Sequence, residues 1–148
     1  MHDAIRFSTL STTRLLSVPL YVLASPKLLE TFPPIRSPND LPPQWCLPLV
    51  NRSWEFIKGK RREGVKPLGR FSSNSGAAMI QASLDGLGIV NVPAYYANDV
   101  VTDGRLVRVL EDWASVEQSV FYLVFPAGRH MPVRVRRLID FLRVAVSD

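Results

Sequence analysis

The sequence has few of the side chains that form disulfides and metal centres. Among its 148 residues there are one cysteine, Cys46, and two histidines, His2 and His130. A single cysteine excludes a disulfide within the chain, so a reducing compartment is the simpler expectation. These three side chains cannot assemble a zinc cluster with the usual ligand spacing. We therefore expect no metal and no cofactor.

Long apolar runs are also scarce, and no apolar stretch approaches the ~20 residues that a transmembrane helix needs. Residues 14–25 have the basic start and apolar middle of a secretory signal. However, Pro19 interrupts this run, and the alternation through Leu20, Val22 and Ala24 is typical of a strand. We expect a cytoplasmic protein with no membrane partner.

Basic residues outnumber acidic ones, which raises the question of a nucleic-acid partner. The net charge is +5 and the isoelectric point is near 9.8. The positive charge gathers in residues 58–62, which Gly59 marks as a hairpin tip, and in the last helix. Short charge runs of this kind are commonly solvent-facing, and no recognition helix accompanies them. The sequence therefore favours solvated surfaces over a DNA-binding surface.

The hydrophobic fraction of 47% and the charged fraction of 21% are ordinary for a soluble globular domain. Apolar periodicity and turn residues predict a mixture of strands and helices along the chain. The predicted strands cover residues 4–7, 18–24, 45–50, 54–57, 61–66, 68–73, 89–92, 106–110 and 119–125. Helices are predicted after Ser25, Asn74 or Ser75, Pro93 and Pro132. The succession of a strand, a helix and a strand over residues 68–92 indicates an α/β fold with parallel pairing.

Two patterns that suggest catalysis or nucleotide binding do not hold in their context. Cys46 and His130 would form a nucleophile pair, but Cys46 lies in an apolar run, and buried cysteines are usually inert. Residues 86–88 resemble part of a dinucleotide fingerprint, yet they close a helix, whereas a phosphate loop opens one. We therefore expect no catalytic residues and no enzyme activity.

One joint in the chain suggests ligand binding. Asn74, Ser75 and Gly76 stand between a predicted strand and the next helix. In open α/β sheets ligands collect outside the carboxyl ends of the strands, and a helix N-terminus there favours an anion. A simple helix cap explains the same residues, and the local sequence favours the cap, with ligand binding as the alternative that stays open at this point.

Many short phrases, in the same order and spacing, resemble the effector-binding half of LysR-type transcriptional regulators. They extend from Asp3 to Leu142, nearly the whole chain. The phrases lie at residues 3–7, 21–29, 37–41, 54–56, 86–93, 104–110, 122–126 and 136–142. The most specific are Gly-Leu-Gly-Ile-Val-Asn-Val-Pro at 86–93 and Gly-Arg-Leu-Val-Arg-Val-Leu at 104–110.

The resemblance implies an α/β fold like that of periplasmic binding proteins, with two lobes and a ligand cleft between them. Residues 18–93 would form the second effector-binding lobe, complete in itself. Residues 1–17 and 94–148 would be the remnant of the first lobe. The family's helix-turn-helix and its opening βα units are not in this sequence, which would make the chain a truncated regulator.

The resemblance also implies which side chains contact the ligand. They match Arg6 and Ser8 on one wall and Asn74, Ser75, Gly76 and Tyr95 on the other. The sequence departs from the family at two positions, because an acidic residue is common where Ser75 stands and an apolar one where Asn91 stands. An altered pocket favours a different effector, which we expect to be small and anionic.

The leading hypothesis is an effector-sensing domain for transcriptional control that binds DNA only through the missing N-terminal domain. We expect it to self-associate as a homo-oligomer, because a partial lobe leaves apolar strand faces and a free sheet edge. A solute-binding module of the transport-receptor type is the alternative. A hydrolase that uses Cys46 or a serine is a third possibility.

Overall fold

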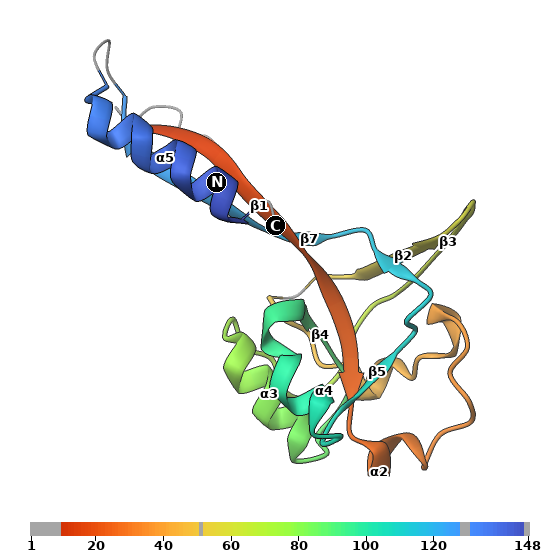
Figure 1. Ribbon diagram of the computed structural model, residues 1–148. Coiled ribbons are helices and arrows are strands. Elements are labelled where there is room, and N and C mark those ends of the chain that lie inside the picture. The colour runs from red at the N-terminus through yellow and green to blue at the C-terminus, as the bar shows by residue number, and fades with distance from the viewer. Residues whose placement is uncertain (1–9, 51, 128–130, 147–148) are drawn as a thin grey trace. The chain divides into compact units, whose positions relative to one another are not determined.

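The computed structural model describes residues 10–50, 52–127 and 131–146 (Figure 1). The predicted strand at residues 4–7 and the site residues Arg6 and Ser8 lie outside this part of the chain. The fold consists of two compact units. Unit 1 combines Met1–Ser17 with Val120–Asp148, and unit 2 is Val18–Ser119. Unit 2 extends beyond residue 93, so the lobe boundaries expected from the sequence do not coincide with its limits and stay a prediction.

Unit 2 is built on an antiparallel sheet in which β1 (Leu10–Ala24) is central. On one side of β1 lies β4 (Val90–Pro93), with Leu20 opposite Pro93. On the other side lies β5 (Val107–Val109), with Val22 opposite Val109. Successive residues of these strands point to opposite faces of the sheet, so each face collects its own set of apolar side chains.

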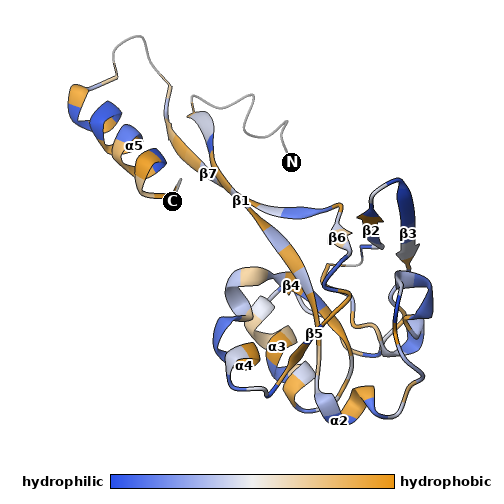
Figure 2. Cartoon of the chain, turned by 45° about the vertical axis from the view of Figure 1, so that its right-hand side comes forward, coloured by the Kyte–Doolittle hydropathy of each residue, from blue (hydrophilic) through white to orange (hydrophobic). Residues whose placement is uncertain are grey.

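One face of this sheet is covered by helices α3 (Gly76–Leu84) and α4 (Asn98–Thr102), as Figures 1 and 2 show. The core on this side joins the two helices to β1 and β4 through Leu23, Met79, Ile80, Val90, Val92, Val100 and neighbouring buried residues. Helix α3 begins where Ser75 accepts a hydrogen bond from the Ala78 amide, at 3.2 Å. It ends before Gly86, whose φ of +79° is the left-handed conformation that glycine tolerates best. Both predicted ends of this helix are confirmed.

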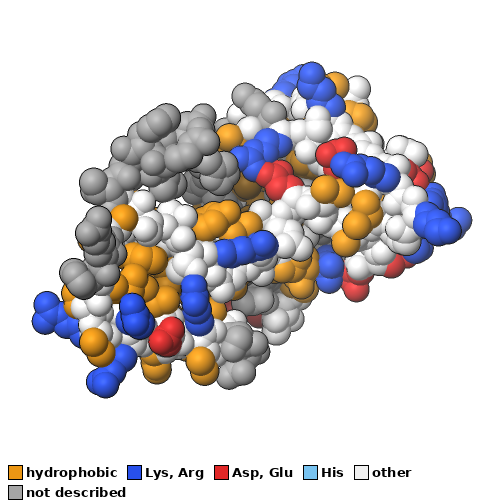
Figure 3. Space-filling model, turned by 90° about the horizontal axis from the view of Figure 1, so that it is seen from above, with side chains coloured by type: hydrophobic (Ala, Val, Ile, Leu, Met, Phe, Trp, Pro, Cys, Tyr) orange, Lys and Arg blue, Asp and Glu red, His pale blue; other side chains and the backbone are white. Residues whose placement is uncertain are grey.

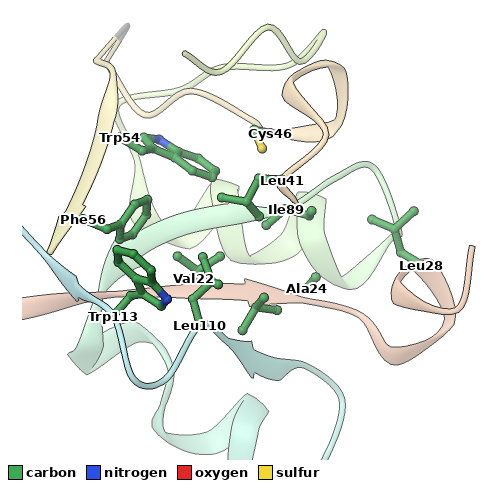
Figure 4. Packing of buried hydrophobic residues seen from close by; sticks show 11 residues of the cluster. Val22, Ala24, Leu28, Leu41, Cys46, Trp54, Phe56, Ile89, Leu110 and Trp113 are labelled. Carbon is green, nitrogen blue, oxygen red and sulfur yellow. The ribbon is translucent and has the colours of Figure 1, made fainter. Parts of the chain in front are cut away.

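The opposite face carries a second core, rich in aromatic side chains (Figure 4). Its members come from the sheet, from the loops after β1 and from a small three-stranded sheet; they include Val22, Ala24, Leu41, Cys46, Trp54, Phe56, Ile89, Leu110 and Trp113. The large rings of Trp54, Phe56 and Trp113 lie together beside Val22 and Leu110. Burial of such rings contributes much of the hydrophobic stabilisation of a domain of this size.

The predicted hairpin is confirmed, and it forms the small sheet together with β6 (Ala114–Ser115). Its strands are β2 (Trp54–Lys58) and β3 (Arg61–Val65), and Gly59 makes the turn with a φ of +61°. The basic residues 58–62 are exposed, and Figure 2 shows β3 as predominantly hydrophilic. The prediction of a solvated charge run is therefore also confirmed.

Two predicted strands are wrong. Residues 68–73 contain no strand; only Ser73 forms an isolated parallel bridge, to Leu49. Residues 45–50 also lack a strand, since they follow the 3-10 helix η2 (Pro43–Trp45). The backbones of these two segments hydrogen-bond to each other, for example from the Gly69 amide to the Cys46 carbonyl at 2.9 Å. The expected parallel pairing is reduced to two isolated parallel bridges, of Leu49 with Ser73 and of Cys46 with Ile89, whereas β4 itself pairs antiparallel with β1.

The shorter predicted helices are mostly present. Ser25 caps α2 (Pro26–Leu29), and residues 38–40 form the 3-10 helix η1 (Pro38–Asp40). The helix predicted over residues 94–103 is divided into η3 (Ala94–Tyr96) and α4. The structure describes no helix that is long and apolar enough to cross a membrane.

Unit 1 contains the first part of β1, most of β7 (Gln118–Pro126) and helix α5 (Val133–Val146). Strand β7 pairs with β1. In α5 Ile139 is buried, whereas the adjacent Leu138 is 56% exposed. Figure 3 shows arginines and hydrophobic side chains interspersed on this helix. The apolar face of α5 is therefore only partly covered within the described residues.

Candidate functional site

A cavity of about 170 Å³ opens on unit 2 where Leu20, inside β1, lies opposite Pro93 at the end of β4. Five of its ten lining residues are apolar, and the other five are polar or charged. The lining residues are Leu20, Leu49, Val50, Arg52, Trp54, Asn91, Pro93, Glu117, Gln118 and Ser119. A largely apolar cavity with a few convergent polar groups is the usual form of a small-molecule site.

Asn91 is the one polar residue of β4, and it is 4% exposed. Its neighbours Val90 and Val92 pack against the helices, so the alternation of the strand turns Asn91 to the face on which Trp54 lies. The side-chain oxygen Oδ1 of Asn91 is buried and has no hydrogen-bond partner among residues 10–50, 52–127 and 131–146. Buried polar atoms nearly always have a partner, so an orphaned acceptor beside a cavity requires an explanation.

The mouth of the cavity carries two charged residues of opposite sign. Arg52 forms an ion pair with Glu117, and both side chains are partly exposed. Nearby, Val50 adopts a φ of +60°, which is rare for a β-branched residue and costs backbone energy. The described wall is therefore balanced in charge and holds strained backbone next to the buried amide.

Asn74, Ser75, Gly76 and Tyr95, the predicted site residues that the structure describes, do not line this cavity. Ser75 caps α3, and its own amide donates to the Ser73 hydroxyl at 3.0 Å. Gly76 lies against the ring of Tyr96, where an added Cβ would stand 2.3 Å from Cε2. Of the two interpretations of the α3 N-terminus, a helix cap and a ligand contact, these contacts favour the helix cap.

Tyr95 connects this region to the cavity. Its ring packs on that of Tyr96 with centroids 4.7 Å apart, and its hydroxyl lies 3.5 Å from the hydroxyl of Ser119, a lining residue. Asn74 precedes the cap and is exposed, whereas the bridge between Ser73 and Leu49 joins its loop to the wall. Ligand contacts by Asn74, Ser75, Gly76 and Tyr95 stay predictions.

Most of the wall was not predicted from the sequence. Asn91 was marked only as a departure from an apolar position, although a lone polar residue in a buried strand was a usable signal. Leu49, Val50, Arg52 and residues 117–119 carry no local pattern, because tertiary packing alone brings them together.

Cys46 does not belong to the cavity. It is fully buried, and its Sγ donates to the Pro42 carbonyl at 3.3 Å. Burial raises the pKa of the thiol to about 12, so the reactive thiolate is suppressed at neutral pH. Among the described residues, no group of three or more metal-ligating side chains gathers.

Together, the antiparallel sheet between a helical layer and an aromatic core, and the cavity beside β1 and β4, define a small-molecule-binding α/β domain. Comparison with known proteins specifies the family. The family model of the LysR substrate binding domain matches residues 1–147, so the chain belongs to this family of effector-binding regulatory domains. The family is one of transcriptional regulators, not of enzymes.

Curated relatives support the same assignment. The HTH-type transcriptional regulator PtxR of Pseudomonas aeruginosa is 32% identical over 142 residues, which are 93% of this chain and 45% of that protein. The HTH-type transcriptional activator TtdR of Escherichia coli (strain K12) is 28% identical over 124 residues, 80% of this chain and 39% of that protein. The chain thus spans less than half the length of these relatives.

Solved structures with the same fold are LysR-type regulators as well. Full-length AphB, a virulence activator of Vibrio cholerae, matches 93% of this chain and 48% of its own with a TM-score of 0.75 and 26% identity. The regulatory domain of AphB from Vibrio vulnificus matches 93% of this chain and 70% of its own, with a TM-score of 0.70 and 27% identity. The expected periplasmic-binding-protein-like α/β fold is confirmed, and the transport-receptor alternative is not favoured.

Proposed function

We propose that this chain senses a small-molecule effector for a cytoplasmic transcriptional regulator, and that a separate helix-turn-helix segment of that regulator binds DNA. One observation carries the proposal: in a LysR substrate-binding domain, a cavity borders a buried amide oxygen that no described residue satisfies. The unsatisfied oxygen lowers the stability of the ligand-free chain. A ligand that fills the cavity and pairs with Asn91 would remove this cost only when bound. Such a contact makes the liganded state selectively stable, which is the requirement for a sensor.

The finer features of the hypothesis stay proposals. The N-terminus of α3 supports an anionic group on the effector, held near Asn74, Ser75, Gly76 and Tyr95, with Arg6 and Ser8 as further contacts. Self-association is supported by the exposed apolar side chains Leu138, Phe141 and Val144 of α5.

The test is ligand screening with the whole chain, followed by NMR. The amides of Leu49, Asn91 and Ser119 should shift together on titration with any hit, because all three line the cavity. Amides of the distant hairpin tip, such as Gly59, provide the internal reference. Ligands that perturb the hairpin or α5 but leave the cavity unchanged would contradict the assignment of the site.

A further inference from the structure

We propose that Asn91 selects an effector that donates a hydrogen bond, namely a molecule with a hydroxyl group on a compact apolar body. This inference rests on the proposed function, because it concerns the ligand of the same cavity. The inference goes beyond the proposed function by assigning the group that the ligand must present and the residue that recognises this group. Asn91 stands where the resemblance described above expects an apolar side chain, so the selectivity is a property of this chain.

The first argument concerns hydrogen bonding. Oδ1 of Asn91 is an acceptor with two lone pairs, and it is buried without a partner in the part of the chain that the structure describes. A ligand hydroxyl can donate to this atom. A carboxylate oxygen has no proton to offer and would meet the amide oxygen with like partial charge. The position of the unsatisfied atom therefore favours a donor over an acceptor on the ligand.

The second argument concerns size and surface. The cavity of about 170 Å³ is close to the ~150 Å³ that holds one benzene molecule in a dry engineered cavity of another protein. Leu20, Trp54 and Pro93 line it together with Leu49 and Val50. A ligand body of about six to eight non-hydrogen atoms, mostly apolar, fits such a space.

The third argument concerns charge. Arg52 and Glu117 are the charged residues in the described wall, and they pair with each other. To bind a carboxylate, Arg52 would have to leave Glu117, which would then face the same ligand charge. Because the pair is already balanced, an uncharged group is accommodated without this loss, so the part of the effector inside this cavity is uncharged and the proposed anionic group belongs outside it, near the N-terminus of α3.

The experiment uses the whole chain and three probes of nearly equal size: phenol, toluene and benzoate. Phenol carries the donor, toluene replaces it with a methyl group, and benzoate carries only acceptors. Dissociation constants are measured by NMR titration on the native protein and on N91L, N91D and N98L. Asn98 is exposed and lies outside the cavity, so N98L is the matched control.

The native chain and N98L should bind phenol at least ~10-fold more tightly than toluene, because a site built to pair with a hydroxyl discriminates against its absence. N91D keeps an acceptor at the same position and should retain this preference, whereas N91L should lose it. The ring protons of phenol should show contacts to Trp54 and Leu20 in the complex.

Three outcomes would overturn the inference. Equal binding of phenol and toluene in the cavity would remove the role of Asn91 while leaving the proposed function intact. Preferred binding of benzoate that N91D weakens would mean that the amide group of Asn91 donates instead. Failure of all three probes to reach the cavity at millimolar concentration would count against the proposed site itself.

Discussion

Cys46 and Asn91 both contribute to the aromatic side of the central sheet, yet burial has opposite consequences for them. The Cys46 thiol is satisfied by the Pro42 carbonyl and behaves as a small apolar group. The Asn91 oxygen is unsatisfied and costs stability until something pairs with it. One residue therefore belongs to the packing of the domain and the other to its binding site.

The thiol gives the domain a characteristic response to alkaline pH. In the folded state burial raises its pKa from the ordinary value of 9.0 to about 12. The folded state therefore holds its proton longer, and this contribution to stability is complete below pH 9 and is lost as the pH rises to about 12. Between these limits the free energy of unfolding should fall by up to about 1.4 kcal/mol per pH unit. Denaturant titrations of the native chain and C46A at several pH values measure the difference in slope, and equal slopes would contradict a buried thiol.

The unsatisfied oxygen of Asn91 predicts that a substitution at the binding site is stabilising. N91L should raise the free energy of unfolding of the ligand-free chain by about 1 to 3 kcal/mol, because a buried orphan acceptor is replaced by an apolar group of similar size. N91A removes the same oxygen but enlarges the cavity, so it should gain less or lose stability. Urea denaturation measures both variants, and a less stable N91L would mean that water already satisfies the amide.

Among helices, strands and turns, the sequence predicted correctly those features whose signal lies within a few neighbouring residues. Ser25, Ser75, Gly59 and Gly86 determine caps and turns within a few residues, and the structure confirms each of them. The predictions of strands at residues 45–50 and 68–73 were wrong because the apolar residues of these segments pack within loops. These loops bond to each other, for example from the Leu68 amide to the Pro43 carbonyl at 2.8 Å.

The same distinction between local signals and tertiary packing explains which site residues could be predicted from the sequence. Helix α3 and its cap follow from a short pattern, so residues 74–76 were within reach of sequence reasoning. The cavity wall combines β1, β4 and two loops far apart in the chain, and no local pattern reports such a meeting. Only the polarity of Asn91 inside an apolar strand marked it in advance.

The junction between α3 and η3 is tight enough for one methyl group to test it. In G76A the new Cβ would stand 2.3 Å from the ring of Tyr96, so the ring or the helix must move. We expect a loss of about 1 to 3 kcal/mol in the free energy of unfolding, although alanine is otherwise the better helix former. Y96L should recover part of this loss in the double variant. Additive effects in that double-mutant cycle would show that the ring is not the obstacle.

For the whole molecule, both hydrophobic cores lie in unit 2, whereas Ile139 is the buried apolar side chain among the described residues of unit 1. Local opening should therefore be easier in unit 1. Amides of Leu23, Val90 and Val92 should exchange with solvent most slowly, and those of α5 much faster. Native-state hydrogen exchange measures this, and equal protection in α5 would indicate that self-association covers its exposed face.

The positive charge of the chain should not produce operator recognition. The exposed residues 58–62 form a hairpin tip, not a helix that enters a major groove. We expect weak DNA binding that disappears at physiological salt, and K60E should weaken it further at low salt. Gel shifts over a salt series test this. A footprint on one defined sequence that survives physiological salt would contradict it.

The orphan oxygen of Asn91 has a consequence for the lifetime of the protein in a cell. A domain that carries this cost is unfolded more often when its effector is scarce, and proteases degrade the unfolded fraction. Effector at 100 times its dissociation constant adds about 2.7 kcal/mol of stability and lowers that fraction about 100-fold. Turnover of the protein should therefore slow when its effector accumulates, so the amount of sensor follows the signal that it detects.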